Sequence, residues 1–248
     1  MKTYKGLVSS DWNECLAPTG PFDPIAFIYP ELKEELDTIF KNYTSNLIPL
    51  SVAVSEIVKL LPQPFTIEQM DAYLDECFAI YKGVVDMIDM LAANDILFMI
   101  NTTGAQGFFQ RIMKKKLIPS VPFVAANPFI KFTGIETDQR FPFLVLETSD
   151  KGTNTESVMK KFMIEPSKVV VIGDSGGDGP HFRWGASVGA FLIGSMTKVS
   201  LKNFCVKNNV VLDNYFGVVY SEKESRVVLR EQTFDFRELG AFIVNRLS

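Results

Sequence analysis

The chain has 248 residues, of which 47% are hydrophobic and 22% are charged, and its formal net charge is −4 at pH 7. This length and apolar content fit one large domain or a core with a smaller domain, and they exclude a disordered chain. The acidic balance argues against a nucleic-acid partner, because binding a phosphate backbone needs a basic surface.

The N-terminal sequence MKTYKGLVSSDW reaches charged residues before any apolar region of a signal peptide could form. The apolar run Ile96–Ile100 is far too short to cross a bilayer. Cys15, Cys77 and Cys205 are odd in number and have no metal-ligand spacing, which is typical of reduced thiols. We therefore expect a cytoplasmic protein with no membrane partner.

Five short apolar runs predict buried parallel strands. They are rich in valine and isoleucine and are bounded by polar or glycine-containing turns, as in strands covered on both faces. The runs are GLVSS before Asp11, ILFMI at 96–100, VPFVAA at 121–126, VVVIG at 169–173 and AFLIG at 190–194. Helical patterns separate them, and the stretch Phe129–Leu146 alternates aromatic and polar residues, which predicts a β-hairpin flap. This alternation of strands and helices predicts a doubly wound α/β sheet, whose ligand site lies beyond the carboxyl ends of the strands.

Residues 18–82 interrupt this alternation and have a helical pattern throughout. Thr66 followed by Gln69 has the signature of a capping box at a helix start. Helices are expected over Pro30–Tyr43, Val52–Leu61 and Thr66–Tyr81. We expect residues 18–82 to form a small helical cap domain over the strand ends, and residues 1–17 with 83–248 to form the α/β core.

Carboxylates follow two of the predicted strands. Asp11 follows the first strand, although an aspartate in this place often only caps the next turn. The sequence Gly173-Asp174-Ser175-Gly176-Gly177-Asp178 ends another strand with two carboxylates four residues apart. Clustered carboxylates are hard oxygen ligands suited to Mg²⁺. A tight glycine turn, with Asp178 capping the following helix, is the alternative interpretation.

Two further features are suited to hold a phosphate. The sequence Thr102-Thr103-Gly104 follows the run ILFMI, where a hydroxyl and backbone N–H groups can bind a phosphate oxygen. Threonine in such a place also commonly caps a helix. Lys151 precedes the helix that leads to the strand at 169–173. A single lysine is usually solvated surface, but this position favours contact with a phosphate or a nucleophile.

Taken in this order, these residues resemble the motifs of the haloacid dehalogenase (HAD) superfamily. Its motifs are a strand followed by D-x-D-x-[TV], a strand that ends in Ser or Thr, a lysine, and a strand followed by G-D-x-x-x-D. The matching residues are Asp11, Thr102, Lys151, and Gly173-Asp174 with Asp178. The resemblance covers nearly the whole chain, and the helical insert resembles the cap of the phosphoserine-phosphatase-like branch.

The resemblance implies a role for each matched residue. Asp11 would be the nucleophile that forms a phospho-aspartyl intermediate with a small phosphate monoester. Mg²⁺ would bind the Asp11 carboxylate, the main-chain carbonyl of Asn13, and Asp174. Asp178 would either bind the metal directly or contact the residues that bind it. The residues expected to bind the phosphoryl group are Thr102, Thr103, Gly104 and Lys151, and the pattern of the following helix favours Thr102 over Thr103 as the motif residue.

Asn13 departs from the family pattern, in which an aspartate two residues after the nucleophile protonates the leaving oxygen and later activates water. An amide cannot transfer a proton, and loss of a general acid–base costs about 10²–10⁴ in rate. Three explanations stay open: a substitution that traps a complex, another acid–base such as Glu14 or His181, or substrates whose leaving group needs no protonation, as in phosphonatases and dehalogenases. A catalytically impaired HAD-like binding protein is the rival hypothesis. We predict a phosphatase first.

Overall fold

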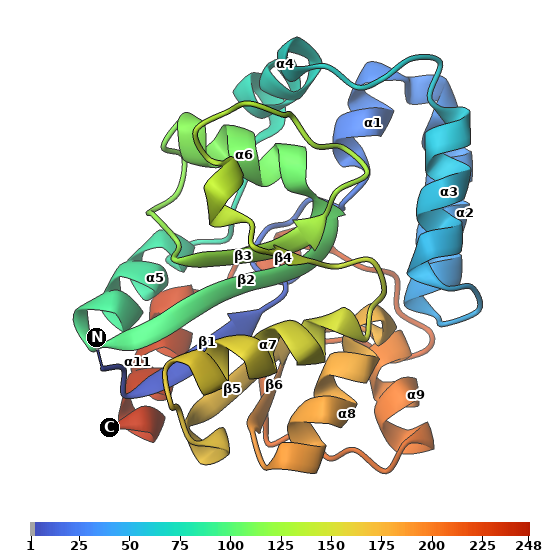
Figure 1. The fold of residues 1–248 in the computed structure, drawn as a ribbon. Helices are drawn as coiled ribbons and strands as arrows, with labels where there is room; N and C mark the ends of the chain where they lie inside the picture. Colours follow the sequence, from blue (N-terminus) through green and yellow to red (C-terminus); the bar gives the residue numbers. More distant parts are fainter. Residues whose placement is uncertain (1–2) are drawn as a thin grey trace.

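The computed structural model describes residues 3–248, which form one parallel sheet flanked by helices (Figure 1). Met1 and Lys2, the first residues of the predicted core segment, lie outside the described residues. Within residues 3–248 the sheet has seven strands in the order β4-β3-β2-β1-β5-β6-β7, and neighbouring strands are parallel. The predicted α/β fold with a doubly wound sheet is confirmed.

The five predicted strands are all present, and two edge strands join them. The strands are β1 (Gly6–Ser10), β2 (Ile96–Ala105), β3 (Phe123–Asn127), β4 (Phe143–Leu144), β5 (Val169–Gly173), β6 (Phe191–Thr197) and β7 (Asn214–Val219). At the centre, Ser10 pairs in register with Ile100 of β2 and Ile172 of β5. Because β1 and β5 run in the same direction and end almost together, the residues that follow them lie side by side at one edge of the sheet.

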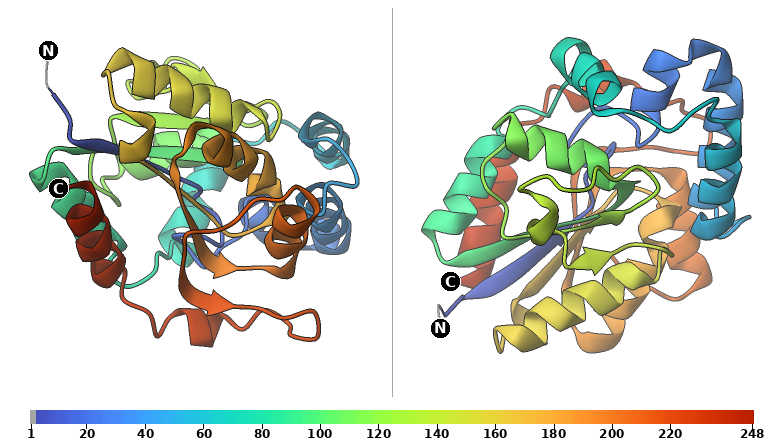
Figure 2. Two further views of the ribbon diagram at one scale, coloured as in Figure 1. Left: turned by 90° about the horizontal axis from the view of Figure 1, so that it is seen from below. Right: turned by 45° about the horizontal axis from the view of Figure 1, so that its top comes forward.

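Helices cover both faces of the sheet (Figures 1 and 2). The core helices are α5 (Val84–Ala93), α6 (Gln106–Lys114), α7 (Asp150–Lys161), α8 (Gly179–Val188), α9 (Val199–Lys207), α10 (Val228–Glu231) and α11 (Phe236–Leu247). Within β1, a Cβ on Gly6 would meet Leu247 of α11 at 2.8 Å, whereas the Ser9 hydroxyl lies 2.8 Å from Thr155 of α7. Since residues 6 and 9 point to opposite faces, α11 and α7 lie on opposite sides. None of the helices in residues 3–248 has the length and hydropathy needed to span a membrane.

Residues 18–82 contain helices and, among the described residues, no strand of the sheet. These helices are α1 (Asp23–Ile28), α2 (Lys33–Thr44), α3 (Leu50–Leu60) and α4 (Ile67–Cys77), with a short 3₁₀ turn at Pro30–Leu32. The capping box is confirmed, because the Thr66 hydroxyl accepts the Gln69 N–H at 3.2 Å and the Gln69 side chain accepts the Thr66 N–H at 3.0 Å. Helices α1, α2 and α3 lie beyond the strand ends, and α4 lies next to the core helix α6 (Figure 1). Their assignment as a separate cap domain stays a prediction.

The prediction of a β-hairpin flap over Phe129–Leu146 is wrong. This segment contains a 3₁₀ turn at Asp138–Arg140 and the short strand β4, which runs parallel to β3. The physical reason lies in Gln110 of α6. Its side-chain amide donates to the Phe132 carbonyl at 2.8 Å and accepts the Phe132 N–H at 2.9 Å. A buried glutamine therefore uses the backbone groups that a hairpin partner would need.

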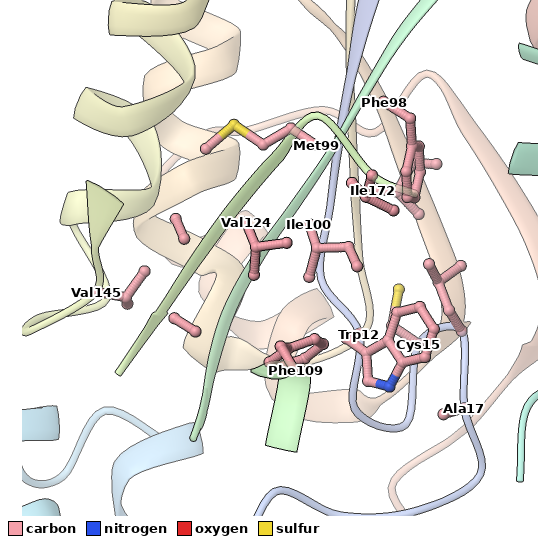
Figure 3. Close-up of a cluster of buried hydrophobic side chains, with 14 of the residues drawn as sticks. Trp12, Cys15, Ala17, Phe98, Met99, Ile100, Phe109, Val124, Val145 and Ile172 are labelled. Carbon is pink, nitrogen blue, oxygen red and sulfur yellow. The ribbon is translucent and has the colours of Figure 1, made fainter. Parts of the chain in front are cut away.

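Trp12, which directly follows Asp11, is fully buried in the core (Figure 3). Its ring meets the ring of Phe109 edge-on, with the centroids 5.8 Å apart. The next buried side chain along the loop, Cys15, lies beside it in Figure 3. This packing holds the backbone at the carboxyl end of β1, so the Asp11 side chain is presented from a rigid position.

Candidate active site

Three carboxylates meet where β1 and β5 end. Asp11 follows β1, Asp174 follows β5, and Asp178 lies one turn further along. One oxygen from each lies within 4.8 Å of the others, and all three side chains are buried. Like charges so close in a low-dielectric environment repel strongly, so this cluster needs cations to be stable.

Lys151 of α7 supplies one of these cations. Its Nζ lies 2.6 Å from Oδ1 of Asp178 and 3.0 Å from Oδ1 of Asp11, and only 1% of its side chain is exposed. Burial disfavours the charged ammonium, but Asp11 and Asp178 outweigh burial and raise the pKa of Lys151. Burial likewise works against an ionised Asp178, yet Lys151 lowers the pKa of this carboxyl below its ordinary value. Both groups are therefore charged at neutral pH.

Asp178 also caps the turn that follows β5. Its Oδ2 accepts the backbone N–H groups of Asp174 at 3.0 Å and Ser175 at 3.2 Å, while Oδ1 accepts from Lys151. Gly173 makes room for this arrangement, because a Cβ on that residue would lie 2.6 Å from Cγ of Asp178. The two interpretations of the glycine-rich sequence therefore hold together, since Asp178 caps the turn and belongs to the carboxylate cluster.

Asp174 has the least satisfied carboxylate of the three. Within residues 3–248 its Oδ1 accepts no hydrogen bond, and its Oδ2 pairs with Nζ of Lys198 at 2.6 Å. Burial, followed by the nearby Asp178 and Asp11, raises the pKa of Asp174 well above its ordinary value. A buried carboxylate oxygen without a partner is costly, and a divalent cation between Asp11 and Asp174 would supply the missing partner. The buried cluster is consistent with a metal site.

The two candidate threonines of β2 differ in what they face. The Thr102 hydroxyl accepts the Gly104 N–H at 3.1 Å and lies 3.4 Å from Oδ1 of Asn13. Thr103 instead lines the small cavity at the carboxylates, and its hydroxyl lies 3.1 Å from the hydroxyl of Tyr43. Gly104 lies close to Asn13, because a Cβ there would approach Oδ1 of Asn13 to 2.6 Å. Of the two threonines, only Thr103 lies on the cavity wall.

The cavity is closed by side chains from the helical segment. Pro21, Phe40 and Tyr43 line it together with Asp11, Lys151 and the turn after β5. Tyr43 and Phe40 come from α2, on the side of the site away from the sheet. Residues of segment 18–82 therefore cover the carboxylates, as a lid that excludes water from a reaction would.

Glu14 and His181 do not line this cavity. Glu14 pairs with Lys198 and with Arg226, whose Nη1 lies 2.6 Å away. Burial would raise the pKa of Glu14, but these two cations lower it below its ordinary value. His181 is fully buried, which lowers its pKa to about 3. Glu14 is thus held ionised and His181 neutral, so neither residue is suited to transfer a proton at Asp11.

His181 belongs to a buried polar network behind Lys151. The Lys151 carbonyl accepts hydrogen bonds from the Asn101 amide and the Thr155 hydroxyl, both at 2.8 Å. The Thr155 hydroxyl also meets His181 Nε2 at 2.9 Å and the Ser9 hydroxyl at 2.8 Å. The Thr155 hydroxyl thus joins the Lys151 carbonyl, Ser9 and His181 in one network. The network fixes the backbone from which the Lys151 side chain extends.

Several of these residues are absent from the candidates found by sequence. Lys198 directly follows β6, and a longer estimate of that strand would have placed it at the same edge as Asp174. Asn101 and Thr155 are polar residues inside apolar patterns, which is a weak signal. Tyr43 lies 60 residues from its partner Thr103 and has no local signal.

Several solved structures share this arrangement of strands and helices. A phosphoserine phosphatase solved as an analogue of its phospho-aspartyl intermediate matches with a TM-score of 0.69 at 20% identity, over 97% of this chain and 99% of the other. A substrate-bound phosphoserine phosphatase complex matches with a TM-score of 0.69 at 19% identity, over the same shares of both chains. The chain has a HAD-like phosphoserine phosphatase fold.

A more distant structure shares the HAD-like fold. A HAD family hydrolase from Salmonella enterica serovar Typhi matches with a TM-score of 0.60 at 13% identity, over 81% of this chain and 66% of the other. No protein-family model matches the sequence, and no curated protein matches it. At these identities the likeness extends to the fold, so the chemistry must be argued from the side chains.

Proposed function

We propose that this chain is a Mg²⁺-dependent phosphohydrolase that cleaves a small phosphate monoester through a phospho-aspartyl intermediate on Asp11. The observation that carries the proposal is the position of Lys151, whose ammonium pairs with both Asp11 and Asp178. These two carboxylates cluster with Asp174, one oxygen of which has no hydrogen-bond partner within residues 3–248. Attack of a carboxylate on a phosphate brings anions together, so it needs fixed positive charge at that point.

The proposed metal ligands are the Asp11 carboxylate, the Asp174 carboxylate and the carbonyl of Asn13. Asp178 is better placed outside direct contact, because both of its oxygens already accept hydrogen bonds. When bound, Mg²⁺ would neutralise charge on the phosphoryl group and on Asp11. All proposed donors are hard oxygen atoms, as this ion prefers.

The protein's own groups have distinct proposed tasks. Asp11 is the nucleophile, and Lys151 orients it and balances the phosphoryl charge. Thr103 holds a phosphoryl oxygen through its hydroxyl, because it lines the cavity. Thr102 and Gly104 bond to each other, so they would have to exchange this bond to join Thr103 in binding the phosphoryl group. Phe40 and Pro21 keep bulk water from the intermediate until turnover.

The substrate class is proposed from the chemistry of the site and from the similar structures. Those proteins are phosphoserine phosphatases, one of them solved with substrate bound. A small phosphorylated molecule suits the chemistry of the cavity at the carboxylates, because Lys151 and Thr103 line it. We also propose a cytoplasmic location, because Cys15, Cys77 and Cys205 are odd in number and far apart in the sequence.

A second candidate function is a binding protein that holds a phosphorylated ligand without turnover. Asn13 supports it, because its amide cannot transfer a proton and is held by the Thr19 carbonyl at 3.3 Å. A hydrolysis screen over phosphate monoesters and phosphonates with Mg²⁺ separates the candidates. The phosphohydrolase releases phosphate from monoesters and loses this activity in Asp11→Asn, whereas a binding protein is stabilised by ligand but releases nothing.

A further inference from the structure

Tyr43 places a phenol hydroxyl in the same cavity as Asp11. Only 3% of this residue is exposed, and its hydroxyl lies 3.1 Å from the hydroxyl of Thr103. The ring is held edge-on by Phe40, with the centroids 5.5 Å apart, and by Phe22 at 6.1 Å. The hydroxyl therefore has a fixed position above the carboxylates, supplied by α2 rather than by the core.

Other groups of the cavity wall that carry a proton are less suited to give it to a leaving group. Lys151 is bound to two carboxylates, and the aliphatic hydroxyls of Ser175 and Thr103 are weaker acids than a phenol. The Asn13 amide is not an acid at neutral pH. With Asp11 as the nucleophile and Asp174 as a proposed metal ligand, Tyr43 is the neutral acid among the cavity-lining residues that remains for a leaving group.

We propose that Tyr43 is the general acid and base of the reaction, in the place where Asn13 cannot act; this rests on the proposed phosphohydrolase function. First, an Asp11 oxygen bonds to phosphorus, the bond from phosphorus to the leaving oxygen breaks, and that oxygen takes the proton of the Tyr43 hydroxyl. Then water attacks the phosphorus of phospho-Asp11 and gives a proton to the Tyr43 phenolate as the bond to Asp11 breaks. The products are an alcohol and phosphate, and both side chains return to their initial state.

The surroundings of Tyr43 suit this order of events. Burial raises the pKa of Tyr43 well above its ordinary value; the hydrogen bond with Thr103 opposes this, and Asp11 and Asp174 add to it. The phenol therefore keeps its proton at neutral pH until an alkoxide, which is a stronger base, develops beside it. The resulting phenolate is then a strong base toward the attacking water.

Tyr43→Phe tests the proposal because it removes the hydroxyl and keeps the ring contacts. We would measure kcat/KM and pre-steady-state bursts with Mg²⁺ on benzyl phosphate, whose leaving group is an alkoxide, and on 4-nitrophenyl phosphate, whose leaving group departs as a stable anion. The variant should lose about 10²–10⁴ in kcat/KM on benzyl phosphate and far less on 4-nitrophenyl phosphate. It should also show a burst of nitrophenolate, because phospho-Asp11 then waits for an unassisted water.

Tyr73→Phe is the matched control, because it removes another buried tyrosine hydroxyl from segment 18–82 at a residue that does not line the cavity. It should show neither the substrate-dependent loss nor the burst. Equal losses on both substrates in Tyr43→Phe, or no loss, would overturn the role of Tyr43. If Tyr43→Phe does not fold, Asn13→Asp decides. A gain of about 10² or more confined to benzyl phosphate would show that an acid was missing and would overturn the role of Tyr43, whereas turnover of benzyl phosphate by the unaltered chain with no gain in Asn13→Asp would support it. Inactivity of the unaltered chain on both esters would instead overturn the phosphohydrolase function itself.

Discussion

Lys151 and Asp178 form an ion pair of 2.6 Å in which both side chains are 1% exposed. Removing one partner of such a pair leaves a buried charge without compensation, which costs about 3–5 kcal/mol. We therefore expect Asp178→Asn to lower the free energy of unfolding by about 3 kcal/mol, since Asp11 still compensates part of the lysine charge. Urea denaturation followed by circular dichroism measures this loss.

The matched control is an exposed ion pair on the same helix. Lys160 and Glu156 of α7 lie 2.7 Å apart, with 69% and 37% of their side chains exposed. Glu156→Gln should cost less than about 1 kcal/mol, because solvent screens the pair. Similar losses of unfolding free energy in Glu156→Gln and Asp178→Asn would contradict a larger contribution from the buried pair.

Thr155 is expected to act on turnover through Lys151. Thr155→Val keeps the shape of the side chain but removes the hydroxyl that bonds to the Lys151 carbonyl and to His181. A displaced lysine should lower kcat by about 10²-fold, the scale of a 1 Å misplacement. Thr155→Ser should restore kcat, whereas Ser157→Ala, which removes an exposed hydroxyl from the same helix, should leave it unchanged. Equal behaviour of the Val and Ser variants would refute this role.

His181 should make stability depend on pH. Its pKa falls from 6.5 to about 3 on folding, so the unfolded chain takes up the proton first and stability is lost as the pH drops from 6.5 toward 3. Between pH 7 and pH 5 this group should cost about 2 kcal/mol. His181→Gln should therefore lose less stability than the unaltered chain over that interval by about this amount. Urea unfolding of both proteins at pH 7 and at pH 5 measures this difference. Equal losses of unfolding free energy in the two proteins would contradict a contribution from His181.

Asp174 should decide whether the site holds a cation. Titration of Mg²⁺ by calorimetry should show one site in the unaltered chain, and saturating Mg²⁺ should raise Tm, because a ligand of the folded state stabilises it. Asp174→Asn keeps the size of the side chain but removes the charge and should abolish both effects. Asp213→Asn, at a carboxylate outside the cluster that accepts the Leu192 N–H, is the control and should leave Mg²⁺ binding intact. Undiminished binding in Asp174→Asn would place the cation elsewhere.

The central strands could be predicted from sequence because their local pattern and their burial agree. β1 and β5 are buried along their whole length, and VVVIG contains no polar residue. The edge strands have no such agreement. β4 has two residues and depends on pairing with β3, and β7 contains Gly217 with a φ of 80°. Their pairing is set by tertiary contacts, which a local pattern does not contain.

The candidate site divides in the same way. Asp11 and Asp174 follow buried strands, so the parallel sheet brings them together without further information. Tyr43 is one of several residues on the buried face of α2, and only the position of that helix over the sheet brings its hydroxyl to Thr103. Lys198 was hidden because the predicted strand stopped at residue 194, whereas β6 continues to Thr197.

Phosphorylation of Asp11 is the step on which the proposed function depends most directly. The measurement is an acid quench during turnover of a ³²P-labelled phosphate monoester with Mg²⁺, followed by digestion and mass spectrometry of the labelled peptide. We expect acid-stable, base-labile label on the peptide that contains Asp11, and none in Asp11→Asn. Steady release of phosphate by the unaltered chain with no label on Asp11, or undiminished turnover by Asp11→Asn, would contradict the phospho-aspartyl reaction.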